Sequence, residues 1–262
     1  MNDAQTPETS TSQSVGNDPA GDTALRIRYR IRFGKTDLLR WISHRDLARL
    51  WERLLRRAEL KLSMTEGFHP KPRIAFPSAL ALGVESYDEV VEIELSEEMT
   101  PQTLLARLQA DQQPGLTIKS VCQLPSGFGK AQLLRSDYTI SVVDGTSPNE
   151  LEASIKDLLD QSEVSVERKK KSLTVKVAEQ IARLELDGDL LRLSLAASDG
   201  ASLKPGDVLD LLGLSDWIER GTLIRRTDVV LKKELDEQDP AVMAVSPTWE
   251  TELTEHSQRH EA

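Results

Sequence analysis

Four arginines recur at helical spacing in one segment, and guanidinium groups are the side chains best suited to phosphate. Residues 43–59 carry Arg45, Arg49, Arg53 and Arg56. On a helix these positions lie along one stripe, away from the apolar positions of the same segment. Like charges in such a row destabilise a helix unless an anion compensates them. The row is therefore typical either of a phosphate-binding surface or of an ordinary solvated face.

A loop rich in proline follows this segment and is the most unusual stretch of the chain. In residues 65–73, Pro70 and Pro72 fix an extended path with little conformational entropy left to lose. An exposed aromatic ring here would stack on a nucleobase, and the basic side chains would donate to phosphates. The alternative is a structural connector with the ring packed beneath it. The candidate contact residues of the loop are Phe68, His69, Lys71 and Arg73.

Two histidines lie in the same part of the chain. His44 and His69 could form an acid–base pair that cleaves RNA without a metal, or they could be unrelated surface residues. Two histidines without a nearby carboxylate pattern are a weak ligand set, so we expect no metal site. The single cysteine excludes internal disulfides and a cysteine-ligated cluster held by this chain alone. We expect no cofactor.

A second group of arginines alternates with apolar residues before the helical segment. Arg26, Arg28, Arg30 and Arg32 face one way and an apolar set faces the other, which is the period of a half-buried strand. This strand could be a nucleic-acid platform. Glu92 and Glu94 of a later strand, however, would neutralise a solvated face through cross-strand ion pairs.

The elements that would position these residues follow the order β-α-β-β-α-β. Ser43 begins the first helix as its N-cap, and Thr100 with Pro101 begins the second. Strands are predicted at residues 25–33, 73–81, 87–95 and 116–124. This order is that of the split βαβ, or ferredoxin-like, unit, in which two helices cover one face of four antiparallel strands.

The rest of the chain repeats the plan. A strand at residues 136–143, a helix capped by Ser147 and a hairpin turning at Asp187 and Gly188 lead to a last helix and strand. The predicted fold class is therefore α+β, with two tandem ferredoxin-like (split βαβ) domains. The first domain covers residues 24–124 and the second residues 136–233, joined by a linker at residues 125–135. Residues 1–23 and the acidic residues 234–262 are expected to be disordered tails.

The charge is distributed unevenly. The whole chain of 262 residues has a net charge of -10, yet residues 24–73 hold 14 Lys or Arg and only 5 Asp or Glu. A basic half-domain thus lies in an acidic protein. No apolar run is long enough to span a bilayer, and no secretory signal is visible, so we expect a cytoplasmic protein without membrane partners.

The residues from Ile27 to Ser86 resemble a known signature. A strand, then S-H-R-D-L, an arginine-rich helix and G-F-H-P-K-P-R-I are similar to the radical SAM-linked protein family. That family is found alone or attached to radical SAM enzymes and has no established activity. The resemblance implies a radical SAM enzyme as functional neighbour. This chain lacks the three closely spaced cysteines of such an enzyme, so it resembles the accessory part.

Three functions remain open from the sequence. The leading hypothesis is a non-catalytic RNA-binding accessory module that presents an RNA or ribonucleoprotein to a separate modifying enzyme. The second is a metal-independent endoribonuclease that uses His69, with His44 as its partner. The third is a protein–protein adaptor in which no RNA takes part. The sequence favours a binding protein over an enzyme, because no catalytic motif is complete.

Overall fold

We describe the fold from a computed structural model of the chain. It describes residues 25–111, 113–168, 171–198, 200, 202–235, 239 and 241–244. The N-terminal tail predicted at residues 1–23 lies outside these ranges. No helix of the described residues is long and apolar enough to cross a membrane.

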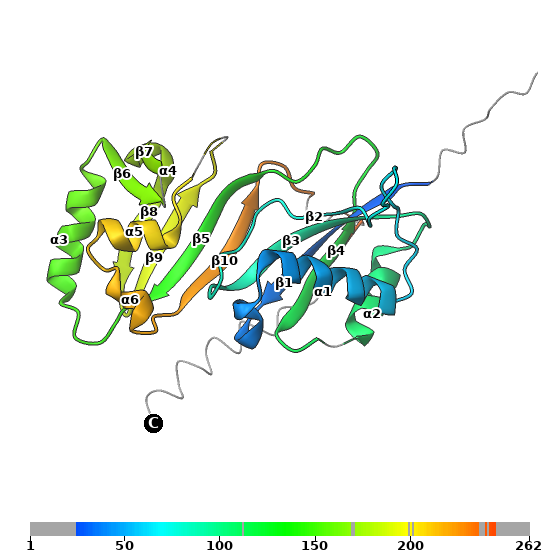
Figure 1. Ribbon diagram of the computed structural model, residues 1–262, viewed down its shortest axis with the longest axis horizontal. Helices are drawn as coiled ribbons and strands as arrows, with labels where there is room; N and C mark the ends of the chain where they lie inside the picture. Colours follow the sequence, from blue (N-terminus) through cyan, green and yellow to red (C-terminus); the bar gives the residue numbers. More distant parts are fainter. Residues whose placement is uncertain are drawn as a thin grey trace, which may run out of the picture.

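A mixed sheet of nine strands runs through the described part of the molecule (Figure 1). Along the sheet the strands are β11 (Val242–Ala244), β4 (Leu116–Gln123), β1 (Ile27–Lys35), β3 (Glu85–Leu95), β10 (Ile224–Leu231), β5 (Leu133–Ser141), β9 (Leu190–Ala196) and β8 (Ile181–Asp187). The short β2 (Ile74–Ala75) pairs with β3 off this path. All the pairs are antiparallel except β3 with β10, which are parallel through Glu85 and Ser86. The α+β class is confirmed, whereas two tandem ferredoxin-like domains are not, because β3 and β10 join both halves in one sheet.

Helices cover one face of this sheet. The first half contributes η1 (Asp37–Trp41), α1 (His44–Arg57) and α2 (Pro101–Ala110). The second half contributes α3 (Pro148–Leu159), α5 (Pro205–Leu211) and α6 (Asp216–Glu219), with an inserted unit of β6 (Glu163–Arg168), β7 (Lys171–Lys176) and α4 (Val177–Gln180). In this unit, β6 and β7 form a separate two-stranded sheet.

Three helices begin where the sequence predicted. The side chains of Ser43, Thr100 and Ser147 each accept a hydrogen bond from the backbone N–H three residues further on. Pro101 and Pro148 occupy the first turn, where the missing N–H has no helical partner to lose. Such caps are local and therefore readable from sequence.

A buried ion pair joins the two halves on the helix-covered face. The Arg226 guanidinium lies 3.0 Å from the Glu89 carboxylate and donates a hydrogen bond to Tyr138 Oη at 3.0 Å. Glu89 and Val91 are two residues apart on β3 and therefore face the same side of the sheet. Val91 packs in the hydrophobic core of the first half, and Tyr138 packs in that of the second half. The helix-covered face of one half therefore continues into that of the other. We call the opposite side of the sheet the outer face.

The structure corrects two boundaries of the predicted domain plan. Residues 125–135 are more than a linker, since Phe128 is buried and β5 already begins at Leu133. The acidic segment from residue 234 is ordered in part: Glu234 forms ion pairs with β1, and β11 extends the sheet beside β4. The rest of that predicted tail lies outside the described residues, apart from Leu235, Asp239 and Ala241.

Candidate nucleic-acid interface

The arginine row of α1 is fully formed and faces solvent. Five apolar side chains of the helix are buried: Leu47, Leu50, Trp51, Leu54 and Leu55. The opposite side of the helix is left to Arg45, Arg49, Arg53 and Arg56, all of which are exposed. The two stripes follow directly from the helical period, as the sequence predicted.

Most of this row has no internal counter-charge. Arg49 lies 3.3 Å from Asp46, and both side chains are more than half exposed, so solvent screens this pair. Arg45, Arg53 and Arg56 make no ion pair or side-chain hydrogen bond with any described residue. The neighbouring Arg57, in contrast, bonds to Asp111 of the segment after α2. The α1 row is thus a line of cations open to an external anion.

The proline-rich loop is a small hairpin braced at its base. Met64 and Pro72 form an isolated bridge, and the Thr65 N–H donates to the Lys71 carbonyl at 2.8 Å. The Lys71 N–H in turn donates to Thr65 Oγ1 at 3.0 Å. Gly67 has a φ of 115°, which a residue with a Cβ rarely adopts. We call residues 64–72 the recognition hairpin.

The tip of the recognition hairpin carries an uncovered ring. The relative exposed area of Phe68 is 101%, so its ring packs on nothing in the described chain. His69 and Lys71 are also exposed. The sequence left open whether the ring would lie beneath the loop, and the structure places it in solvent. A single exposed ring is common on protein surfaces, but in this position its face is free to stack on a base.

Arg73 differs from the other candidate contact residues because its guanidinium bonds inside the protein. Its Nε donates to the Met64 carbonyl at 3.1 Å and lies 3.7 Å from Glu94. Glu66 lies 3.8 Å from the same guanidinium and 2.7 Å from that of Arg26. Arg73 therefore braces the base of the recognition hairpin against β3, and Glu66 links the hairpin to Arg26 just before β1.

The hairpin and the second half of α1 lie at the same end of the molecule. After α1 the chain turns back at Glu59, whose φ is 54°, and reaches the end of β3 within a few residues. There Ser63 N–H donates to the Glu94 carbonyl at 2.8 Å. Figure 1 shows this connection leading from the C-terminal end of α1. Arg53 and Arg56 are the members of the row nearest to this end.

The two histidines are not brought into contact. The His44 ring packs edge-on against Phe76 at a centroid distance of 5.2 Å, next to the N-terminus of α1. His69 lies in the exposed part of the recognition hairpin, seven residues before Phe76. No contact joins the two rings among the described residues. The pairing of His44 and His69 for RNA cleavage therefore stays a prediction, without a direct contact to support it.

Three of the four predicted strand arginines, Arg28, Arg30 and Arg32, form a largely buried network on the outer face, whereas Arg26 precedes β1, is exposed and pairs with Glu66. Arg30 is 2% exposed and lies between Glu92 at 2.9 Å and Glu234 at 2.8 Å, with its guanidinium over the Phe128 ring. Arg28 bonds to Glu92 at 2.7 Å, and Arg32 bonds to Asp88 and Glu234. The expected pairing with Glu92 is present, whereas Glu94 pairs with Arg73 instead, and the expected solvated face is absent from the described residues. Segments 125–133 and 232–235 contribute the additional cover.

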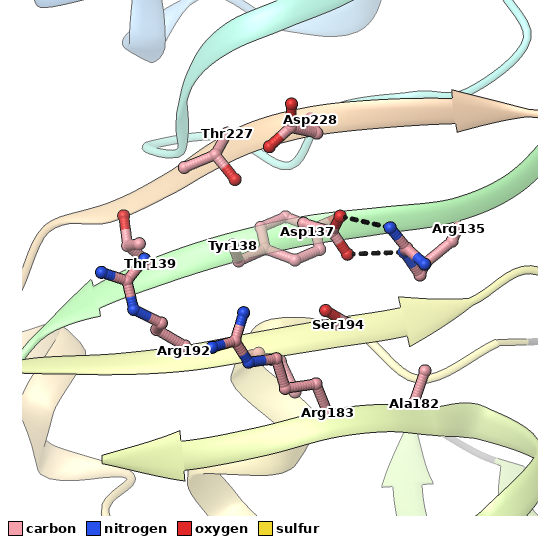
Figure 2. Close-up of a pocket in the computed structure, with 11 residues that line it drawn as sticks. Arg135, Asp137, Tyr138, Thr139, Ala182, Arg183, Arg192, Ser194, Thr227 and Asp228 are labelled. Carbon is pink, nitrogen blue, oxygen red and sulfur yellow. Dashed lines mark hydrogen bonds and ion pairs between the residues drawn. The ribbon is translucent and has the colours of Figure 1, made fainter. Parts of the chain in front are cut away.

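A pocket that the sequence did not indicate lies on the outer face of the second half (Figure 2). It has a volume of about 370 Å³ and is lined from β5, β8, β9 and β10. Polar residues that alternate with core residues form it, among them Thr139 and Arg192. Alternation of this kind was visible in the sequence, but it indicates only an exposed strand face.

Comparison with known proteins gives a family and two structural likenesses. A family described as "Uncharacterized protein conserved in bacteria (DUF2344)" matches residues 28–205. The match carries no reference to radical SAM enzymes. A search of curated proteins found no match.

Two solved structures match this chain at low similarity. The chain is 14% identical to one in a Cbf5-Nop10-Gar1 complex, covering 77% of this chain and 48% of that one, with a TM-score of 0.40. It is 11% identical to a chain of an H/ACA RNP bound to a substrate RNA containing 2'-deoxyuridine, covering 77% and 47%, with a TM-score of 0.37. The match covers about half the length of each of these two chains.

Proposed function

We propose that this chain, which belongs to the bacterial family described as "Uncharacterized protein conserved in bacteria (DUF2344)", is a non-catalytic RNA-binding accessory module. The observation that carries the proposal is a fully exposed Phe68 at the tip of a braced hairpin, at the same end as the unpaired Arg53 and Arg56. A single-stranded RNA needs both features: cations along its backbone and an aromatic platform for a base.

Each part of the surface has its own task in this proposal. The α1 row contacts successive phosphates, and Arg45 and Arg49 extend the track beyond Arg53. Phe68 stacks on one base, while His69 and Lys71 donate to the adjacent phosphates. Arg73 keeps the hairpin in position through its bonds to Met64 and Glu94 rather than by direct contact with RNA.

The proposed architecture is two split βαβ units fused along β3 and β10. The strand orders β4-β1-β3-β2 and β10-β5-β9-β8 support this interpretation, because each is the order of a ferredoxin-like unit. The first unit would hold the RNA surface. The cytoplasm is the proposed compartment, since a single unpaired cysteine suits a reducing environment.

A binding test with graded salt examines the RNA surface. Affinity of the full chain for a single-stranded RNA should fall with salt with a log–log slope of about -3 if four phosphates are contacted. Phe68→Ala should weaken binding by about 1–3 kcal/mol at constant salt slope, because a stacked base is lost. Arg53→Ala should flatten the slope by about 0.7.

Arg220→Ala is the matched control for this series. That arginine is exposed but pairs with Asp216 at 3.4 Å, far along the chain from the proposed surface. The proposal fails if RNA does not bind at low salt, or if Phe68→Ala and Arg220→Ala bind equally well.

A second candidate function, a protein adaptor, is favoured by a separate apolar patch. Leu38, Trp41 and Leu82 are 84%, 58% and 62% exposed, and η1 lies against the Gly83 turn through a Gly83 N–H···Arg40 carbonyl bond of 2.9 Å. Asp37, with a φ of 52°, turns Leu38 outward. The patch is a candidate docking site for a partner enzyme, which the resemblance implies to be a radical SAM enzyme. Pull-down with and without nuclease distinguishes the two functions, since partners lost after nuclease treatment argue against an adaptor.

A further inference from the structure

The nine-stranded sheet ends at an edge strand with which no other described strand pairs. β8 is the last strand of the sheet, next to β9, and no strand of the described chain lies along its other edge (Figure 2). Edge strands are commonly protected by proline or lysine, by a covering loop or by being very short. The opposite end of the sheet follows this rule, because its last strand, β11, has only three residues. β8 has seven residues and contains neither proline nor lysine.

The hairpin turn determines which backbone groups of β8 point to the open edge. A two-residue turn at residues 188–189 joins β8 to β9, so the residues that flank it form the hydrogen-bonded pair that closes the hairpin. Such pairs alternate along an antiparallel ladder. Glu185 is therefore bonded to β9, while the N–H and C=O groups of Leu184 and Leu186 point away from it. No backbone hydrogen bond from another described element reaches Leu184 or Leu186.

The two faces of β8 carry different side chains. Leu184 is buried in the hydrophobic core of the second half, and Leu186 is partly buried against the same core. Arg183, Glu185 and Asp187 are exposed on the outer face. Arg183 and Glu185 form an ion pair with each other, so neither is a free charge. A strand added to this edge would therefore have to match a row that holds both signs.

A second copy of β8 matches this row in one antiparallel register. With the two-fold axis at Leu184, the two copies of Leu184 exchange both backbone hydrogen bonds, and Arg183 lies opposite the partner's Glu185. Arg183 and Glu185 direct their own backbone groups to β9, so across the new interface they form non-hydrogen-bonded pairs, in which side chains lie closest. An axis at Arg183 or at Glu185 would place two like charges directly opposite. An axis at Leu186 would place Glu185 opposite the partner's Asp187.

We infer that the β8 edge binds a second copy of this chain in the register centred on Leu184, joining two sheets into one. The interface is isologous, since both copies use the same edge. Backbone hydrogen bonds at the edge and further burial of Leu186 stabilise it, and the two cross-strand ion pairs select the register. The inference does not rest on the proposed function, because α1 and the recognition hairpin belong to the other half of the chain.

Sedimentation velocity of the full chain over a range of concentrations tests the inference. The wild type should sediment as a reversible dimer. Arg183→Glu and Glu185→Arg should each weaken the dimer at least about tenfold, because each substitution replaces two opposite-charge pairs by two like-charge pairs. Both side chains are exposed, so circular dichroism should show an unchanged fold. Arg220→Glu is the charge-matched control, since that exposed arginine follows α6 and pairs with Asp216.

A mixture of the two monomeric variants makes the test specific to this register. R183E has a carboxylate at both facing positions and E185R has a guanidinium at both, so the two chains together should form a mixed dimer about as tight as that of the wild type. Misfolding of either variant would not be repaired by mixing. A monomeric wild-type chain would leave the edge without a second copy and overturn the inference. Undiminished dimers of R183E or E185R, an equal loss in Arg220→Glu, or a mixture that stays monomeric would also overturn it.

Discussion

The arginines of β1 and those of the α1 row both recur at regular spacing, yet the fold uses them in opposite ways. Arg30 is nearly inaccessible and held by two carboxylates, whereas Arg53 is exposed and pairs with no described residue. The carboxylates that neutralise Arg30 lie 62 and 204 residues further along the chain. A row of cationic residues in a sequence therefore does not by itself predict an anion-binding surface. The internal ion pairs of each residue have to be known first.

The largest effect is expected when a carboxylate is removed from the buried arginine network of β1. Glu92→Ala should lower the free energy of unfolding by about 3–5 kcal/mol, because it leaves Arg30 buried with less than its required counter-charge. Glu92 also accepts from Arg28 and from the Ala131 N–H at 3.1 Å, which anchors the covering segment. Urea denaturation of variant and wild type measures the change. A loss below about 1 kcal/mol would mean that the network behaves like an ordinary surface pair.

The cover over the outer face is tested by the single thiol. Burial raises the pKa of Cys122 to about 11 from an ordinary value of 9.0, and β11 pairs alongside it. At pH 8 the native thiol should therefore alkylate about a hundredfold more slowly than the same thiol in urea, because only the thiolate reacts. The rate should rise with pH up to about 11 in the native chain. Similar rates in native and unfolded chains would show that this face is open.

Substitution in the exposed α1 row should have the smallest effect on the free energy of unfolding. Arg53→Ala should change the free energy of unfolding by less than about 0.5 kcal/mol, since its guanidinium stabilises nothing in the described chain. Urea denaturation beside Glu92→Ala gives the direct contrast. A large destabilisation by Arg53→Ala would show that the α1 row is structural, and would remove the reason to assign it an external anion.

Local features of the fold could be predicted from the sequence. The caps at Ser43, Thr100 and Ser147 depend on contacts three residues apart, and the apolar stripe of α1 depends on the helical period. The exposure of Phe68 could not be predicted, because an aromatic ring between prolines is equally compatible with packing under the loop. The ordering of Glu234 was missed for a related reason: an acidic segment without periodicity resembles a tail until its cationic partners are known.

The candidate sites divide in the same way. The spacing of Arg45, Arg49, Arg53 and Arg56 already determined that they share a helical stripe, whatever the rest of the molecule does. Only the tertiary structure decided that Arg45, Arg53 and Arg56 remain without an ion pair among the described residues, and that β3 and β10 join the halves into one sheet. The physical reason is range. Backbone period and capping act over a few residues, whereas charge neutralisation and burial depend on residues that are distant in the chain and adjacent only after folding.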